Sequence, residues 1–558
     1  MPTNNAQLDL VVQSAVNVDA DVAVADDQTF TVGCTAPTIT NALNQLQGSR
    51  WAPTDRLWRI PATGPNAKAL YDLCMAHGLT VREDAHERLD ELRTLSALSR
   101  ALDGPILDIQ LGETPRPFQW AAVEYVRRAR RVVIGDDRGI GKTAEALIAV
   151  EALGAYPCLI VVQPGVVVKW LRDAELWLPH RSASAAKDDD ITVVSYDELR
   201  NDETLTRMSW QTIICDEAHV LRTAKAQMTQ AVHRIARRAS VAMLLTGTPL
   251  ANRPRDLISL LTILGRLEAF GGWDGYTKRY CGRKKTRLGH WDISGASRLE
   301  ELHERLRDTC YIRRLKKDAL PELLGKTRHI VTVTLGDREA YDRATHDAIR
   351  PMAHDGRGGE GALEWARRWR RAEALVRQTR LRAITTAAKL PAAVDWIRTQ
   401  LTDRPEAKIA VFAESVAAQK HILAAFPQAA ALLGGTRPRK RQEIIDEFTA
   451  DPDCRLIVCA LRAAGVGIEL QAAKLALIVD LPWVPLDLDQ AEDRLARWGQ
   501  LWMVEVTYLI AAGTIDEDMV ARLNIKADVS GRVSDGIDYE SVELIPTGNR
   551  KTVSVGGN

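Results

Sequence analysis

Short apolar runs alternate with helical patterns in two separate stretches of this chain, and this alternation limits the folds it can adopt. From residue 104 to 260 the runs are RVVIG, CLIVVQP, ITVVSYD, TIICDEA and AMLLTGTP. From 408 to 526 they are KIAVFAES, AALLGG, RLIVCAL, LALIVDLP and VEVTYLIAAG. Nearly continuous Val, Ile and Leu runs that end at Gly, Pro or Asp are typical of buried parallel strands. The sequence therefore predicts two doubly wound α/β domains, with ligands at the carboxyl ends of their strands.

The rest of the chain is predicted to form smaller units around these two domains, because 558 residues are too many for one hydrophobic core. RLWRIPATG is typical of a strand and turn, and NAKALYDLCMAHG of a helix closed by Gly78. We expect a leader at 1–30, an α+β accessory domain at 31–100, a first α/β domain at 101–330 with a helical insertion from about 261, a basic helical linker at 331–390, a second α/β domain at 391–526 and a poorly ordered tail at 527–558.

Composition restricts the class of protein less than the distribution of charge does. The net charge is only +1, so no overall basic field predicts a nucleic-acid partner. The basic residues instead gather in clumps, which either contact phosphate or lie on solvated helix faces. Eight scattered cysteines without zinc spacing, no membrane-length apolar run and no signal peptide predict an intracellular protein with reduced thiols. The clumps are RRARR at 127–131, RRLKK at 313–317, ARRWRRAEALVRQTRLR at 366–382 and RPRKR at 437–441.

The segment VVIGDDRGIGKT, at 132–143, is predicted to bind nucleotide phosphates. A strand leads into a loop containing Gly139 and Gly141, then into a helix, so backbone N–H groups can surround phosphate oxygens. Lys142 would reach the β- and γ-phosphates, and the Thr143 hydroxyl would bind Mg²⁺. The strict phosphate-loop pattern has Gly where this chain has Asp136. The alternative is an ordinary strand-loop-helix turn.

Two further strands are followed by residues suited to phosphate chemistry. After TIIC, Asp216 can hold Mg²⁺ and Glu217 can orient and deprotonate the attacking water. After AMLL, Thr246 and Thr248 can sense the γ-phosphate. The alternatives are acids that favour a helix N-terminus in the first case, and a Gly-Pro turn in the second.

The segment QAEDRLARWGQ, at 490–500, has a helical pattern with a polar face that needs explaining. As a helix it places Gln490, Arg494 and Arg497 on one face. A surface ion pair between Asp493 and Arg497 would account for only one of the two arginines. The neighbouring apolar stripe consists of Leu488, Ala491, Leu495 and Trp498.

Taken in order, these motifs resemble those of the Snf-type family of superfamily 2 helicase-like ATPases. PRPFQWAAVEYV, at 115–126, is similar to the family's adenine-side segment, in which Gln119 would read the base. GDDRGIGKT, DEAH, TGTPLAN, VFAES, AAGVGIEL and QAEDRLARWGQ follow. The family's phosphate loop begins with Asp, which accounts for Asp136. The resemblance covers about 104–525 and implies two RecA-like lobes that bind ATP and Mg²⁺.

Two other segments resemble a particular branch of this family. SGASRLEELHERLRDTCYIRRLKKDALPELLGKTR, at 294–328, is similar to the HepA-related annealing helicase branch, including its bacterial and phage relatives. Residues 40–82 resemble the small accessory domain of that branch, with Trp51 and Trp58 as anchors, the alternative being an unrelated α+β cap. We therefore expect a bacterial or phage relative located in the cytoplasm and associated with the nucleoid.

The resemblance implies an ATP-driven motor that tracks along duplex or forked DNA and anneals strands. It assigns catalysis to Lys142, Glu217, Arg494 and Arg497, with the two arginines acting as fingers. It assigns nucleotide contacts to Gln119, Asp136, Gly139, Gly141, Lys142, Thr143 and Gln490, and Mg²⁺ to Thr143 and Asp216. The rival predictions are a DNA-binding scaffold with a vestigial ATPase, and an RNA helicase.

The chain departs from the family's pattern at three positions. Ala460 stands where the family usually has Ser or Thr, and Glu469 where it usually has Asn. Neither side chain can substitute directly, and Glu469 would repel a phosphate, so coupling between DNA and hydrolysis is in question. Arg138 replaces an apolar residue of the phosphate loop, and we expect it to face solvent rather than phosphate. On the basic helix, Trp365 and Trp369 are expected to be core anchors rather than base-stacking platforms.

Overall fold

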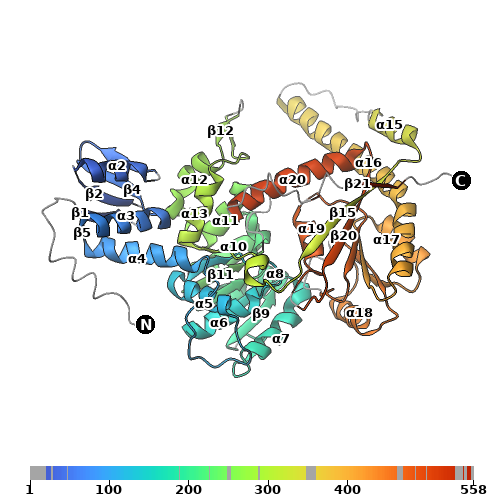
Figure 1. The fold of residues 1–558 in the computed structure, drawn as a ribbon, viewed down its shortest axis with the longest axis horizontal. Coiled ribbons are helices and arrows are strands. Elements are labelled where there is room, and N and C mark those ends of the chain that lie inside the picture. The colour runs from blue at the N-terminus through green and yellow to red at the C-terminus, as the bar shows by residue number, and fades with distance from the viewer. Residues whose placement is uncertain are drawn as a thin grey trace. The chain divides into compact units, whose positions relative to one another are not determined.

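Every apolar run that the sequence predicts as a strand forms one. Figure 1 shows the fold of the chain. The chain divides into two compact units, Met1–Ala319 with Val529–Asp538, and Leu320–Asp528 with Tyr539–Asn558. None of the described helices is long and apolar enough to cross a bilayer. The computed structural model describes residues 21–534 except 27–28, 35, 47, 188, 225, 248–252, 287–288, 347–359, 462–468, 484 and 498, together with Ile545 and 550–553.

The first unit is built on a parallel sheet of seven strands in the order β14-β6-β11-β10-β7-β9-β8. Its central strands are buried on both faces, as their apolar composition predicts. The strands are β6 Arg131–Ile134, β7 Cys158–Val162, β8 Ala183–Ser184, β9 Ile191–Ser195, β10 Thr212–Cys215, β11 Val241–Leu245 and β14 Tyr311–Ile312. The helices of this layer are α5 Pro117–Ala129, α6 Lys142–Leu153, α7 Val167–Trp177, α8 Tyr196–Asn201, α9 Glu203–Arg207 and α10 Gln227–Ala236.

A helical insertion lies between β11 and β14, as the sequence predicts. It consists of α11 Leu257–Ile263, α12 Gly272–Tyr280 and α13 Leu299–Thr309, with a two-stranded hairpin of β12 Lys284–Lys285 and β13 Trp291–Asp292. Side chains from these helices pack into the core of the first sheet, so the insertion is continuous with it.

The accessory domain is a five-stranded sheet with three helices, and it begins before the expected residue 31. Its order is β3-β4-β2-β1-β5. Strand β1 lies within the expected leader and β2 begins in it, which corrects that boundary to residue 21. Trp58 is buried in the core, whereas Trp51 is 40% exposed, so only Trp58 anchors the domain. Its elements are β1 Asp21–Asp26, β2 Thr29–Gly33, α2 Pro37–Gln45, β3 Arg50–Ala52, β4 Leu57–Pro61, α3 Gly64–His77, β5 Thr80–Val81 and α4 Glu83–Leu98.

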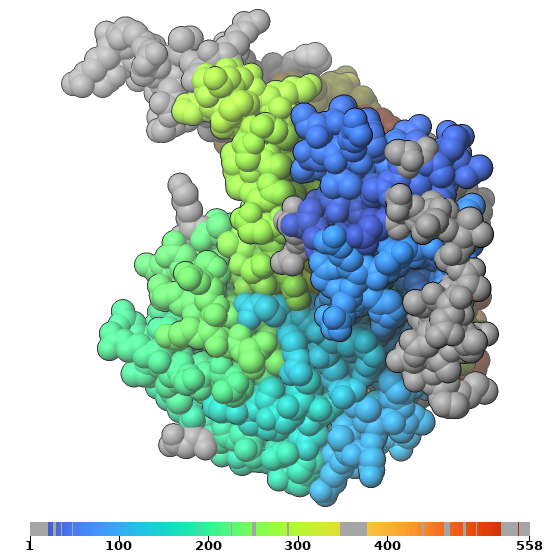
Figure 2. Space-filling view, turned by 90° about the vertical axis from the view of Figure 1, so that its left-hand side faces the viewer, coloured from blue at the N-terminus to red at the C-terminus, as the bar shows by residue number. Residues whose placement is uncertain are grey.

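Polar contacts hold the accessory domain against the insertion, and Figure 2 shows the dark blue domain lying beside the yellow-green helices. Gly64 N, at the start of α3, donates to the Asp308 carboxylate on α13 at 2.5 Å. The neighbouring Arg307 Nη1 donates to the Ser99 carbonyl at 2.9 Å. Because these groups are buried, the accessory domain and the insertion form one body within the first unit.

The second unit contains another seven-stranded parallel sheet, in the order β17-β18-β16-β19-β20-β15-β21. Its strands are β15 Lys326–Val333, β16 Ile409–Ala413, β17 Ala430–Leu432, β18 Leu456–Ala460, β19 Leu475–Ile478, β20 Val504–Ala511 and β21 Arg550–Val553. Its helices are α15 Arg338–His346, α16 Glu360–Asp403, α17 Val416–Ala425, α18 Pro438–Ala450, α19 Pro485–Glu492 and α20 Ile515–Ser534.

Two expected boundaries of the second unit are wrong. The division lies after Ala319 rather than near 330, because β15 pairs with β20 along its whole length. The expectation of a poorly ordered tail fails at Arg550–Val553, which pair with β15 as β21. The basic stretch 366–382 is helical, as expected, but the side chains of Trp365 and Trp369 lie outside the described residues.

Candidate nucleotide site and its supporting residues

The loop between β6 and α6 closes around its own lysine. Gly139 (φ 79°) and Gly141 (φ 110°) adopt the left-handed backbone conformation that favours glycine. Lys142, the first residue of α6, donates from Nζ to the carbonyls of Asp136 (2.7 Å) and Asp137 (3.0 Å). Burial lowers the pKa of Lys142, since the ammonium has left bulk water. The loop therefore holds the Lys142 ammonium group against two backbone carbonyls. Phosphate oxygens can replace these carbonyls as its hydrogen-bond acceptors.

Gln119 also lies against this loop, and its expected contact with the base stays a prediction. Its Oε1 accepts from Arg116 N at 2.8 Å, and its Nε2 donates to the Gly141 carbonyl at 3.4 Å. A Cβ at Gly141 would lie 2.6 Å from Gln119 Nε2, so a larger residue there would displace the glutamine. Gln119 therefore couples α5 to the phosphate loop, and Thr143 follows on α6 with a half-buried side chain.

The side chain of Asp136 is engaged by a protein group, and its expected role as a nucleotide contact stays a prediction. Its side chain is fully buried and accepts from Arg314 N at 2.8 Å and from Arg314 Nη1 at 2.7 Å. Arg314 Nη1 also lies 3.7 Å from Glu145, whose pKa is raised by burial and by the Asp136 charge. The aspartate that replaces glycine thus ties the loop to the segment after β14.

The neighbouring residue, Arg313, makes a second clamp on the same loop. It donates to the Gly135 carbonyl at 2.7 Å and the Gly247 carbonyl at 3.2 Å, and it pairs with Asp137 at 2.7 Å. Arg313 and Arg314 are both buried. Neither of them therefore lies on a solvated helix face or is open to a DNA phosphate, which are the two interpretations of the RRLKK clump. Sequence reasoning missed these residues because their partners lie far away in the chain.

The acid pair lies at the carboxyl end of β10, two strands from β6 in the sheet. Asp216 accepts from Trp170 Nε1 at 2.8 Å and from Glu217 N at 2.9 Å. Burial and the Glu217 charge raise the pKa of Asp216. Burial also acts to raise the pKa of Glu217, but His219 at 3.1 Å and the charges of Arg138 and Lys142 outweigh it, so that pKa is lowered. Glu217 is thus held ionised close to Lys142.

Arg138 is turned toward this corner of the site, so the expectation that it faces solvent is wrong. A Cβ at Gly247 would lie 2.6 Å from Arg138 Cγ, which means that the arginine stem packs over the loop after β11. Its charge is close enough to lower the pKa of both Glu217 and Lys142. Thr246 is fully buried in the same loop, and Thr248 lies outside the described residues.

In the second unit, the helix that contains Gln490 is shorter than the sequence pattern predicts. It ends at Glu492, and Arg494 and Arg497 lie in the turns that follow, so the three residues do not share one helix face. Gln490 is buried, as are Leu488, Ala491 and Leu495 of the expected apolar stripe, while Trp498 lies outside the described residues.

Buried ion pairs hold the C-terminal end of α19 against β15. Glu492 is fully buried and pairs with Lys326 at 2.6 Å and with Arg328 at 2.6 Å, both on β15. Burial acts to raise the pKa of Glu492, but the two cations outweigh it and lower that pKa to about 2. Gln500 Nε2 then donates to the carbonyls of Gln471, Ala473 and Leu495, each at 3.1 Å. The motif's Glu and final Gln are therefore structural residues.

Arg497 is paired with the residue at which the chain departs from its family. Its Nη2 lies 3.0 Å from Glu469 Oε1, and the Arg497 side chain is 18% exposed against 42% for Glu469. Ala460, the other departure in this motif, is buried at the end of β18. Residues 462–468, between the two, lie outside the described residues.

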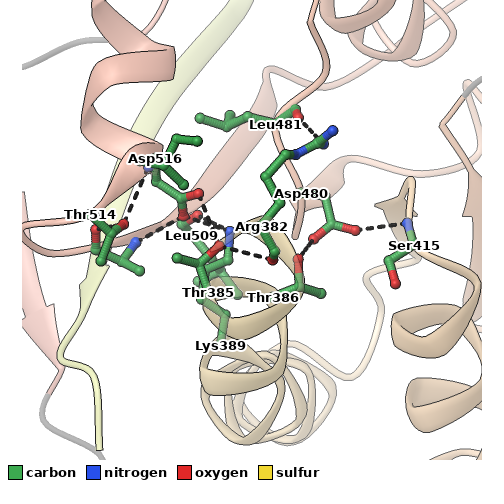
Figure 3. Close-up of polar contacts among 12 residues, drawn as sticks. Arg382, Thr385, Thr386, Lys389, Ser415, Asp480, Leu481, Leu509, Thr514 and Asp516 are labelled. Atoms are coloured by element: carbon green, nitrogen blue, oxygen red, sulfur yellow. Dashed lines mark hydrogen bonds and ion pairs between the residues drawn. The ribbon is translucent and has the colours of Figure 1, made fainter. Parts of the chain in front are cut away.

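Side chains of helix α16 form polar contacts with residues at the strand ends of the second sheet, as Figure 3 shows. Arg382 donates to Glu414 Oε2 and to the Leu481 carbonyl, each at 2.6 Å. Thr386 Oγ1 donates to Asp480 at 2.6 Å, and Asp480 in turn accepts from the backbone N of Ser415. On the same helix, Lys389 pairs with Asp516 at 2.8 Å, and both are buried. Arg382, the last residue of a basic clump, thus orders the ends of β16 and β19.

Both α/β blocks match family models. The SNF2-related domain matches residues 116–384, and the helicase conserved C-terminal domain matches residues 392–499. The chain belongs to the SNF2-related family of helicase-like ATPases.

Its curated relatives are considerably longer proteins. It is 31% identical over 447 residues to the DNA annealing helicase and endonuclease ZRANB3 of Bos taurus, covering 75% of this chain and 40% of that protein. It is 30% identical over 444 residues to SWI/SNF-related matrix-associated actin-dependent regulator of chromatin subfamily A-like protein 1 of Xenopus tropicalis, covering 76% of this chain and 45% of that protein. The SWI2/SNF2 ATPase core of Sulfolobus solfataricus in complex with dsDNA aligns at 22% identity over 79% of this chain and 99% of that chain, with a TM-score of 0.37, too low to bear on function. The relatives named first are animal proteins, and a bacterial or phage source stays a prediction.

Proposed function

We propose that this chain is an ATP-driven translocase that moves along duplex or forked DNA and rewinds separated strands. The observation that carries the proposal is the convergence of Lys142 and Glu217 within the first unit. Each charge alters the pKa of the other, and they follow strands that are two apart in one parallel sheet. A phosphate-binding cation beside an ionised carboxylate is what nucleotide hydrolysis needs.

Each residue of the first unit then has a distinct role. Lys142 exchanges its two loop carbonyls for the β- and γ-phosphate oxygens. Glu217, whose pKa is lowered, is ionised at neutral pH and can orient and deprotonate water. Arg138 adds positive charge on the side of the loop after β11.

The metal expected here is Mg²⁺, held by Thr143 and Asp216. Within the described ranges, no group of three or more His, Cys, Asp or Glu side chains could hold a metal ion. This fits Mg²⁺, which is usually bound through one or two protein oxygens together with substrate phosphates and water. When bound, Mg²⁺ would neutralise phosphate charge. Ionised Asp216 would be its carboxylate ligand beside the Thr143 hydroxyl, and the Trp170 hydrogen bond would orient that carboxylate.

Arg494 and Arg497 are proposed to supply the remaining positive charge for phosphoryl transfer. For Arg497 this requires release from Glu469, because one guanidinium edge is already engaged by that carboxylate. If they act this way, replacing either with Ala slows hydrolysis far more than it weakens ATP binding. Equal losses of hydrolysis and of ATP binding would instead assign the two arginines a structural role.

DNA as the partner is proposed from the relative named DNA annealing helicase and endonuclease ZRANB3, and from the family. Because the chain spans only about 40% of those relatives, we extend to it the motor activity and not the endonuclease. The proposed location is the cytoplasm, on the nucleoid.

The test is ATP hydrolysis by the purified chain with duplex DNA, forked DNA, single-stranded DNA and RNA. We expect strong stimulation by duplex or forked DNA, and loss of turnover in Lys142→Ala. Stimulation by RNA above DNA would assign an RNA helicase. DNA binding with no hydrolysis above the Lys142→Ala background would assign a scaffold.

A further inference from the structure

The hairpin β12–β13 on the helical insertion carries charge and aromatic surface that the ATP site does not use. From Trp273 to Asp292 the chain has six basic and two acidic residues, whereas its overall net charge is only +1. Lys284, Lys285 and Trp291 are all exposed. This segment therefore carries a net positive charge.

An arginine between two tryptophans organises this surface. The Arg283 guanidinium lies 4.3 Å from the ring centre of Trp291 and 5.5 Å from that of Trp273. The Arg283 side chain is only 5% exposed and pairs with Asp274 at 2.5 Å. The two rings, in contrast, are 47% and 44% exposed. Arginine stacked on aromatic faces is a favourable arrangement, so the rings are ordered although they face solvent.

The base of the hairpin is fixed to the insertion, which keeps this surface in place. Ser297, just after the second strand, donates from N to the Tyr280 carbonyl (2.9 Å) and from Oγ to the Arg279 carbonyl (2.7 Å). A Cβ at Gly295 would lie 2.9 Å from the Cys281 carbonyl, so the two ends approach as closely as glycine allows. A two-stranded hairpin is marginally stable alone, and these contacts tie it to α12.

We propose that the β12–β13 hairpin binds single-stranded DNA, with Trp291 and Trp273 stacking on unpaired bases and Lys284 and Lys285 contacting phosphates. This inference rests on the proposed DNA motor. Exposed aromatic rings among cations are the usual means of holding a single strand, because every base offers a π-face. Paired bases hide those faces in the duplex, so the hairpin distinguishes the open arm of a fork from duplex DNA. In the other basic clumps, protein groups engage Arg131, Arg313, Arg314 and Arg382.

The test compares the affinity of the full chain and its variants for a labelled oligo-dT strand and for a blunt duplex. Trp291→Ala is expected to weaken oligo-dT binding about tenfold, since loss of a stacked base typically has an effect of this order. Its duplex affinity is expected to stay near that of the unaltered chain. Trp51→Ala is the matched control, because Trp51 is a similarly exposed tryptophan on the accessory sheet.

Phosphate contact is tested separately, by salt dependence. Replacing both Lys284 and Lys285 with Ala is expected to reduce the slope of log affinity for oligo-dT against log salt by about 1.4. Unchanged oligo-dT affinity in Trp291→Ala, an equal loss on duplex, or an equal loss in Trp51→Ala would each overturn the inference. Failure of the motor proposal is distinguishable, because it would appear as an absence of DNA-stimulated hydrolysis in the unaltered chain.

Discussion

Arg497 Nη2 lies 3.0 Å from Glu469 Oε1, so a candidate catalytic arginine is paired with the residue that replaces the family's usual asparagine. Considered separately, Glu469 is a departure from the family's pattern, and Arg497 is proposed to act as an arginine finger. Their contact joins the two observations, because the carboxylate competes with any phosphate for the same guanidinium.

Glu469→Gln should therefore raise the rate of ATP hydrolysis at saturating DNA. A partly exposed ion pair contributes about 0.2–1 kcal/mol, which corresponds to an increase of at most about fivefold. The increase should shrink at high salt, because salt already screens the pair in the unaltered chain. Steady-state turnover at two salt concentrations measures both effects.

Glu406→Gln is the matched control for this change, since Glu406 forms a similar ion pair with Lys474 at 2.6 Å in the same unit. It should leave turnover unchanged. A slower Glu469→Gln enzyme would show that the carboxylate positions Arg497 rather than restraining it.

Arg314→Met should destabilise the first unit strongly. Removing the guanidinium leaves Asp136 as a buried carboxylate without its cation, a change that typically costs about 3–5 kcal/mol. Adding Asp136→Asn should recover part of the loss, because no charge then remains to be compensated. Calorimetric unfolding measures both variants, with Arg207→Met, which removes a pair exposed on both sides, as the control. Equal stability of Arg314→Met and Arg207→Met would contradict this account of the loop.

The two sheets are predicted well because most of their strands are marked by a residue pattern within the strand itself. Nearly every predicted strand is a short run of branched apolar residues that any parallel sheet would bury, and the loops after them are marked by glycine, lysine or acids. The strands β14, β15 and β21 are not predicted from the sequence. They are defined by pairing with β6, β20 and β15 respectively, rather than by a strong pattern of their own.

The site was predicted less completely, because several of its residues act through distant partners. Lys142, Asp216 and Glu217 follow their strands as expected, and each motif marks its own place. Asp136, in contrast, takes its role from Arg314, which is 178 residues away. The end of α19 depends in the same way on Glu492 and the cations of β15. Tertiary pairing of this kind leaves no local pattern.

Docking of the accessory domain should depend on pH through Asp308. Burial raises the pKa of Asp308 to about 7, against about 3.9 in an unfolded chain. The folded state therefore binds this proton more tightly, so the stabilisation is complete below pH 4 and is lost as pH rises toward 7. Asp308→Asn, which cannot ionise, should be more stable than the unaltered chain at pH 8 by up to about 4 kcal/mol.

The measurement for this prediction is thermal unfolding of both proteins between pH 4 and pH 8. Their difference should vanish near pH 4 and grow toward neutral pH. A difference independent of pH would mean that Asp308 does not titrate in this range. A less stable Asp308→Asn at pH 8 would show that the ionised carboxylate is favoured by Gly64 N at the start of α3.

We propose that ATP hydrolysis at the Lys142 and Glu217 site drives movement along duplex DNA. Displacement of a third strand from a DNA triplex measures that movement without requiring strand separation. With ATP, the unaltered chain should displace the third strand, whereas Glu217→Gln should bind ATP and DNA but leave the triplex intact. Displacement by Glu217→Gln at the unaltered rate, or DNA-stimulated hydrolysis by the unaltered chain without displacement, would contradict the account.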